Sequence, residues 1–176
     1  PILFLPGDTY ANRMPDPVLQ QVEHFSNPGM TANDSFKPVT KYFDRITRPE
    51  QIIQSLPQAI QTMLDPADTG PACLSLCQDV QGEIFDYPEE FFKDRIHNIR
   101  RPKPDDFQIK QAMEKIKKSK KPIIISGGGV FYSDAMDELG SFAIKHNIPV
   151  TQTVMGYSTM KRDHSHFLGP IGGLGG

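Results

Sequence analysis

The stretch Pro122-Ile123-Ile124-Ile125-Ser126-Gly127-Gly128-Gly129 decides the fold. A short apolar run that ends in glycines is typical of a strand buried on both faces of a parallel sheet and followed by a tight turn. Ser133 is the expected N-cap of the next helix, whose inner face carries Met136, Leu139, Phe142 and Ala143. Asn147 suits the left-handed position that ends this helix, and residues 148–153 form the next strand. A right-handed crossover makes the two strands parallel.

The same alternation of strand and helix precedes this unit. The sequence predicts three strands, at residues 2–5, 39–46 and 72–77. A turn is expected at residues 6–8, a short helix capped by Asp16 follows, and a polar loop leads to the second strand. Thr47 is the expected N-cap of a longer helix that Pro57 kinks. The predicted fold class is therefore α/β, built of parallel-sheet units.

Residues 85–105 differ in composition from both flanking regions. They contain Pro88, Pro102 and Pro104, mixed charges and little periodicity, which is typical of an interdomain linker. A helix capped at Asp105 or Asp106 then begins the second unit, and the lysines at its end complement the helix dipole. We expect one domain at residues 1–84, a linker at 85–105 and a second domain at 106–176.

Composition and charge exclude several classes of protein. Of the 176 residues 38% are hydrophobic, and the net charge of −2 argues against nucleic acid or an anionic membrane as partner. No apolar run is long enough to span a bilayer, and no signal peptide is visible. Cys73 and Cys77 lie four residues apart in a predicted strand, roughly 13 Å by extended geometry, which is beyond disulfide reach. They indicate a reducing compartment, so we expect a cytoplasmic protein.

Both ends of the sequence suggest a segment of a longer polypeptide. The first five residues form an apolar strand without a polar lead-in, and the last eight, 169–176, form a Gly-rich loop. We therefore expect apolar sheet edges that lack their neighbours, and hence self-association or exchange of partners.

Two patterns suggest ligand sites. The turn Gly127-Gly128-Gly129 could bring backbone amides to a phosphate, but the dinucleotide fingerprint is incomplete, because Thr151-Gln152-Thr153 stand where an acidic residue is required. A turn that lets helix pack on strand is the favoured interpretation, and a nucleotide-binding module is an alternative. Asp163, His164 and His166 suggest a metal site, but their spacing makes convergence on one ion unfavourable.

The residues alone identify no catalytic group. No Gly-x-Ser-x-Gly elbow occurs, and neither cysteine lies at a helix start. The paired carboxylates Glu89 and Glu90 lie in the linker and are expected to face solvent.

Several motifs resemble one enzyme family over essentially the whole length. Residues 70–76, followed by Gln78-Asp79-Val80, resemble the closing strand of the pyrimidine-binding domain in thiamine-diphosphate (ThDP) enzymes of the acetolactate synthase and pyruvate oxidase group. Lys121-Pro122, with the Ile-rich strand and the glycine turn, resembles the opening of the Rossmann-like central domain. The resemblance implies the C-terminal half of the first domain followed by the first half of the second.

Five strings are more specific, and they are similar to the branch of the family that hydrolyses a trihydroxycyclohexanedione in inositol breakdown. They are residues 5–9, 15–21, 33–38, 44–51 and 78–83. Synthases and decarboxylases of the family carry different residues in the first three. An acetolactate synthase-like carboligase or decarboxylase is the alternative within the family.

The resemblance also implies where the cofactors bind. ThDP is activated by a glutamate, and its diphosphate is held through Mg²⁺ by a Gly-Asp-Gly motif and a later asparagine pair. By the resemblance, these groups lie before residue 1 and after residue 176. We therefore expect a homo-oligomeric parent enzyme that acts on a small cyclic dione, and a segment that is inactive alone and binds neither cofactor fully.

The resemblance leaves a few residues that could border the ThDP or substrate cleft. By position these candidates are Gln20, Gln21, Phe36 and Lys37, and Asp8 joins them because it comes just after a strand end, where the ligand sites of α/β proteins gather. Gly7-Asp8-Thr9, with Asn33-Asp34 later, loosely imitates the metal motif, but the flanking strings match the pyrimidine domain instead. FAD, which some relatives hold in the central domain, has little support from the glycine turn.

Overall fold

The structure is a computed structural model that describes residues 2–12, 24 and 26–173. The chain divides into two compact units, Pro1–Arg100 and Arg101–Gly176. Each unit contains a sheet whose strand pairs are all parallel, with helices packed against it, so the predicted α/β class is confirmed.

The sheet of the first unit is built around β4 (Ala72–Cys77). Parallel strand β3 (Tyr42–Ile46) pairs along one side of it, and β1 (Leu3–Phe4) and β2 (Gly7–Asp8) pair in succession along the other. Pro6 interrupts the ladder because it has no N–H, but its carbonyl still accepts a bond from the Leu76 amide at 2.9 Å. The turn expected at residues 6–8 is therefore wrong.

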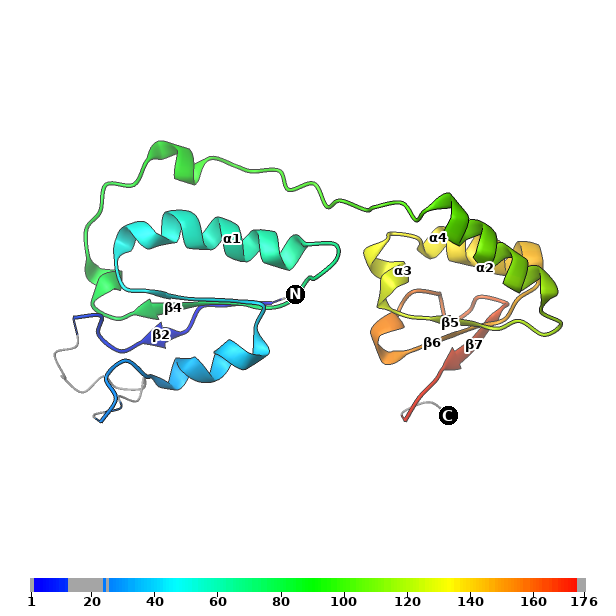
Figure 1. Ribbon diagram of the computed structural model, residues 1–176, viewed down its shortest axis with the longest axis horizontal. Helices are drawn as coiled ribbons and strands as arrows, with labels where there is room; N and C mark the ends of the chain where they lie inside the picture. Colours follow the sequence, from blue (N-terminus) through cyan, green and yellow to red (C-terminus); the bar gives the residue numbers. More distant parts are fainter. Residues whose placement is uncertain (1, 13–23, 25, 174–176) are drawn as a thin grey trace. The chain divides into compact units, whose positions relative to one another are not determined.

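The two faces of this sheet are covered differently (Figure 1). Helix α1 (Ile52–Leu64) packs on one face, over a core that contains Ala59, Ala72 and Leu74. The 3-10 segment η1 (Ala32–Val39) covers the other face, where the sequence suggested a polar loop and the start of a strand. A capping box between Thr31 and Asp34 explains why this segment is helical. The helix predicted after Asp16 lies outside the described residues.

The start of α1 also differs from the prediction. A short 3-10 turn, η2 (Pro49–Gln51), precedes α1 and is N-capped by Arg48. Thr47 is not the cap, because its amide and hydroxyl both donate to Gln51 Oε1, at 2.7 and 3.0 Å. Pro57 lies inside α1, which continues through it.

The first part of the expected linker is attached to this unit. After the turn η3 (Val80–Gly82), the chain forms a second short turn, η4 (Glu89–Phe92). Phe85, Phe91 and Phe92 pack around Tyr87, with the Phe91 ring centroid 5.8 Å from that of Tyr87. The Tyr87 hydroxyl donates to the carbonyl of Pro49 at 3.3 Å. The domain boundaries at residues 84 and 106 stay predictions.

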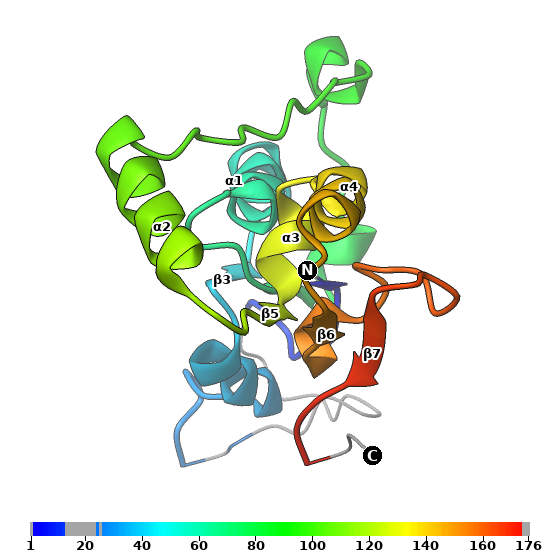
Figure 2. The ribbon, with the colours of Figure 1, turned by 90° about the vertical axis from the view of Figure 1, so that its right-hand side faces the viewer.

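The second unit begins with α2 (Asp106–Lys118), whose predicted N-cap Asp105 is confirmed. Its sheet has the parallel order β5 (Ile124–Ser126), β6 (Val150–Gln152), β7 (Phe167–Pro170), and Figure 2 shows the three strands. Helix α4 (Met136–His146) packs on this sheet through Leu139 and Ala143. The predicted left-handed position of Asn147 is also confirmed, with φ of 51°.

Two expectations for this unit are wrong. A separate helix, α3 (Gly128–Tyr132), follows the glycine turn, and Ser133 is its C-cap rather than the N-cap of α4. Asp134 then takes a left-handed conformation, so the chain turns before α4 begins. Ile123 and Ile125 are 53% and 57% exposed, because β5 is the outer strand of the described sheet and Ile125 points away from α4. Helix α2 likewise buries none of its residues.

Candidate functional site

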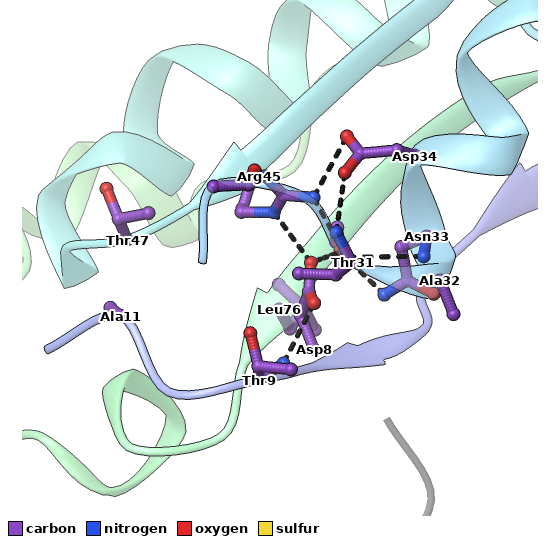
Figure 3. A network of polar contacts seen from close by, with 12 residues as sticks. Asp8, Thr9, Ala11, Thr31, Ala32, Asn33, Asp34, Arg45, Thr47 and Leu76 are labelled. Carbon is purple, nitrogen blue, oxygen red and sulfur yellow. Dashed lines mark hydrogen bonds and ion pairs between the residues drawn. The ribbon is translucent and has the colours of Figure 1, made fainter. Parts of the chain in front are cut away.

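A buried polar network fills the sheet face of the first unit that η1 covers. Asp8, at the carboxyl end of β2, is fully buried and accepts from Arg45 Nε at 2.7 Å. It also accepts from the Thr9 amide at 2.8 Å and from the Ser75 hydroxyl of β4. Figure 3 shows Asp8 and Arg45 facing one another beside β4. The faces of parallel sheets are usually apolar, so a cluster of buried charged groups on this face is unusual.

The Arg45 guanidinium extends the network to η1 and the chain before it. Its Nη2 donates to Thr31 Oγ1 at 2.9 Å and lies 3.1 Å from Asp34 Oδ1. Its Nη1 donates to the carbonyl of Gly29 at 3.3 Å. One planar group therefore holds two carboxylates and a backbone carbonyl, which uses the fixed fork of donors that arginine provides.

The charges of the network are matched. Burial raises the pKa of Asp8, but hydrogen bonds from Ser75, Arg45, Thr31 and the Thr9 amide outweigh it and lower the pKa overall. Burial opposes ionisation of Asp34 too, yet its bonds to Lys37, Thr31 and Arg45 hold its pKa at about 2. Both carboxylates are therefore ionised at neutral pH, and neither can act as a general base that holds a proton near pH 7.

A second carboxylate fixes the chain that leaves β2. Asp79, just beyond β4, accepts from the amides of Ala11 at 2.8 Å and Asn12 at 3.1 Å. Burial raises its pKa, but these bonds and that of the Val80 amide lower it overall. Asp79 lies in one of the strings that carry the resemblance, and in the structure its carboxylate binds the backbone amides of the chain that follows β2.

Of the cleft candidates that the structure describes, Asp8 lies within the network and Lys37 joins it through Asp34. Phe36 stacks on Phe4 of β1, with ring centroids 5.5 Å apart. The Lys37 ammonium is paired with Asp34 at 2.7 Å and lies 5.2 Å from the centre of the Phe43 ring. Gln20 and Gln21 lie outside the described residues. Among the described candidates, Asp8 is the one at the carboxyl end of a strand, where ligands of α/β proteins bind.

Residues 7–9 and 33–34, which loosely imitate the metal-binding motif of the family, lie close together in the structure. Asn33 Nδ2 donates to the carbonyl of Gly7 at 2.7 Å, and Asp8 and Asp34 both face Arg45. A guanidinium therefore lies where a cation between these carboxylates would bind. Within residues 2–12, 24 and 26–173, no group of three or more His, Cys, Asp or Glu side chains could hold a metal ion.

The histidine pair of the second unit makes local contacts. The rings of His164 and His166 are 5.9 Å apart, and His166 Nε2 lies 3.0 Å from Asn147 Oδ1. His164 Nδ1 accepts from the His166 amide at 3.2 Å.

The glycine turn is packed against its own chain. A Cβ on Gly128 would lie 3.1 Å from the Met155 carbonyl oxygen, in the turn η5 (Val154–Gly156). In return, a Cβ on Gly156 would lie 2.2 Å from the Ser126 carbonyl oxygen. Close packing of two backbone segments therefore explains these glycines without a bound phosphate.

A cavity of 290 Å³ lies at the carboxyl ends of β3 and β4. Its wall includes Ile46, Leu76 and Cys77, and Tyr87 of the expected linker borders it. Burial raises the pKa of the Cys77 thiol to about 11, so this thiol is a poor nucleophile at neutral pH.

Sequence reasoning missed Arg45, Ser75 and Asp79. Arg45 gave one signal, because it is one of two adjacent charged residues in a strand whose positions alternate between the two faces, so that Asp44 and Arg45 must point to opposite sides. The partners of Arg45 lie on segments remote in sequence, so local spacing could not predict them.

Comparisons with known proteins agree with the resemblance. Residues 109–176 match the family described as thiamine pyrophosphate enzyme, central domain. Proteins named 3D-(3,5/4)-trihydroxycyclohexane-1,2-dione hydrolase from Clostridium perfringens and Clostridium botulinum are 51% and 52% identical to the chain. Each alignment covers 99% of this chain and 27% of the relative, so the chain spans about a quarter of their length.

A solved structure supports the fold. A thiamine diphosphate-dependent 4-hydroxybenzoylformate decarboxylase from Rhodococcus jostii matches 97% of this chain and 31% of its own, with a TM-score of 0.72 and 21% identity. At that identity the likeness concerns the arrangement of helices and strands. No helix among the described residues is long and apolar enough to cross a membrane.

Proposed function

Because the chain belongs to the thiamine-diphosphate-dependent enzymes, we propose that the protein containing it hydrolyses a carbon–carbon bond of 3D-(3,5/4)-trihydroxycyclohexane-1,2-dione. The ring opens to 5-deoxyglucuronic acid, a step of myo-inositol catabolism. The observation that carries this proposal is identity of 51% and 52%, over 99% of the chain, to relatives named for that substrate.

The cofactors of this reaction are thiamine diphosphate and Mg²⁺. Mg²⁺ requires oxygen ligands in nearly octahedral geometry, several of them carboxylates, waters or phosphates. Asp8 and Asp34, the carboxylates of the imitated motif, are both paired with Arg45. The residues described here therefore do not fit the metal. We assign the metal ligands and the activating glutamate to the rest of the protein, so the segment alone is inactive.

The segment contributes to the architecture of the cleft. Residues 1–84 form the C-terminal part of the pyrimidine-type domain, 85–105 a linker, and 106–176 the first part of the central domain. Asp8, Gln20, Gln21, Phe36 and Lys37 border the ThDP or substrate cleft. Asp8 supports this assignment best, because it lies at the carboxyl end of a parallel strand. The turn at residues 127–129 is a weaker phosphate candidate, since η5 packs against it.

The protein is proposed to be a cytoplasmic homo-oligomer. Cys73 and Cys77 are buried free thiols, which suits a reducing compartment. Exposed apolar side chains on β5 and near β1 suit burial by further parts of the protein or by another subunit.

The test uses the intact protein with the dione, ThDP and Mg²⁺. Loss of dione and formation of the deoxy acid, followed by NMR, is the expected result. Pyruvate is the control substrate, because an acetolactate synthase-like enzyme converts it and the proposed hydrolase does not. Pyruvate turnover without ring opening would replace the proposal by the synthase-like alternative. Residues 1–176 alone should convert neither substrate.

A further inference from the structure

The chain just before η1 is held to the sheet mainly by polar contacts. Gly29 and Met30 are exposed, and Thr31 is the first buried residue of this stretch. Arg45 contacts the Gly29 carbonyl and the Thr31 hydroxyl, while Asp34 accepts from the Thr31 amide at 2.7 Å. The apolar clusters of the described residues do not include residues 29–31, so polar bonds hold this stretch. They come from Arg45 and from the neighbouring Asn33, whose Nδ2 donates to the Gly7 carbonyl at 2.7 Å and to the Ser75 hydroxyl at 2.8 Å.

These contacts are separate from the core that stabilises the first unit. The clusters around Leu74 and Ile46 both include Ile52 of α1. Arg45 projects to the opposite face, since its neighbour Asp44 is bonded to Ser55 of α1. Loss of Arg45 therefore removes the bonds to the Gly29 carbonyl and the Thr31 hydroxyl, while the apolar clusters and the Asn33 bonds stay in place.

The network also joins segments that carry the resemblance to the dione hydrolases. Three of the strings that resemble the dione hydrolases, residues 5–9, 33–38 and 44–51, meet here through Asp8, Asp34 and Arg45. A buried polar cluster costs free energy unless every member is satisfied, and such clusters fix one arrangement of the groups that join them. Segments remote in sequence are thus held in one place at the carboxyl edge of the sheet.

We propose that Arg45 is a positioning residue for the ring-opening reaction: fixed between Asp8 and Asp34, its guanidinium holds residues 29–34 where the sheet edge borders the substrate. This inference rests on the proposed function. A lysine cannot replace it, because one ammonium cannot bind both carboxylates and the Gly29 carbonyl in the same plane.

The experiment uses the intact protein with three variants, R45M, R45K and R48M. Arg48 is the matched control, since it is 71% exposed and its pair with Glu50 is long, at 3.5 Å. Steady-state turnover of the dione gives kcat and KM. Thermal unfolding and ThDP affinity report the fold and the cofactor site. Hydrogen exchange of a peptide that covers residues 26–36 reports the position of the segment.

A displacement of about 1 Å away from the reacting atoms can cost up to about 100-fold in rate. R45M is therefore expected to lower kcat/KM by roughly 10- to 100-fold and to speed exchange in the reporter peptide, with ThDP affinity unchanged. R45K should retain one ion pair and fall between R45M and wild type. R48M should match wild type in every measurement.

Each other outcome has a definite meaning. If R45M unfolds earlier but keeps wild-type kcat and KM, Arg45 is structural only and the inference is overturned. If R45M does not fold, R45K decides, and wild-type kinetics of R45K overturn the inference. If the wild-type protein opens no dione ring, the proposed function fails by itself. Exchange in the reporter peptide then still tests Arg45, since equal exchange in R45M and R48M rejects its holding role.

Discussion

Replacing Asp8 by asparagine tests whether the buried network stabilises the first unit. The change keeps the size of the side chain and removes its charge. Asp8 is fully buried and accepts from Arg45 Nε at 2.7 Å, from the Thr9 amide at 2.8 Å and from Ser75. An asparagine amide can accept only part of these bonds, and its NH₂ group would face donors.

The cost follows from what remains around Arg45. Breaking a fully buried ion pair costs about 3–5 kcal/mol. Arg45 is 20% exposed, however, and Asp34 stays 3.1 Å from it, so its charge is not left uncompensated. We therefore expect D8N to destabilise the first unit by about 2–3 kcal/mol, near the cost of losing one charged hydrogen bond. That corresponds to opening about 30- to 150-fold more often.

The assay is hydrogen exchange with mass spectrometry, because the two units can open separately. Amides of β4 report the first unit, and amides of β6 serve as the internal control. Asp68 provides the matched variant, since it forms a 2.5 Å pair with Lys41 at the surface, where such pairs contribute about 0–1 kcal/mol. If β4 exchanges no faster in D8N than in D68N, the reasoning about the buried pair is refuted.

Three further predictions concern separate sites. Gly156→Ala places a Cβ 2.2 Å from the Ser126 carbonyl oxygen, so we expect the free energy of unfolding of the second unit, measured in urea, to fall by roughly 1–3 kcal/mol. Gly129→Ala is the control and should be tolerated, because nothing lies within 4 Å of its Cβ; equal effects of the two changes would contradict this. The pKa of Asp34 is lowered from 3.8 to about 2, so its contribution to stability is complete above about pH 4 and is lost as the pH falls toward 2. Asp8 and Asp79, whose pKa values are also lowered, act in the same direction, so the urea midpoint should fall in both proteins but less steeply in Asp34→Asn than in wild type; equal slopes would contradict this. Ile125→Lys should reduce the self-association of residues 1–176, measured by light scattering. Because Ile125 is 57% exposed, the unfolding temperature should not fall. Unchanged association would show that this strand edge is not the surface through which the segment associates.

The alternation of strands and helices could be predicted because hydrophobic spacing is a local property. Residues 72–77 became β4 with the bounds that the sequence indicated, and Asp105 caps α2 as its position before the apolar face suggests. Asn147 ends α4 in the left-handed conformation for the same local reason. These features depend on residues within a few positions of one another.

The predictions about the fold are wrong where contacts between residues remote in sequence determine the structure. Gly7 and Asp8 have the composition of a turn, yet pairing with β4 draws them into the sheet. Ser133 has the side chain of an N-cap, but the chain had already begun a helix at Gly128, so Ser133 ends that helix instead. Ile125 has the apolar character of a core residue, and its exposure follows from which neighbours the described sheet contains.

Of the buried network, the sequence alone pointed to Asp8, because it follows a strand end, where ligands of α/β proteins bind. That Asp8 borders a cleft stays a prediction. Arg45 lies 37 residues away and Ser75 lies 67, so no spacing rule connects them to Asp8. Their pairing depends on the register of β3 and β2 with β4, since Arg45 lies opposite Ser75 and Asp8 opposite Cys77. A shift of one residue would turn Arg45 toward α1 and leave Asp8 buried without its counter-charge, so the network itself specifies the register that assembles it.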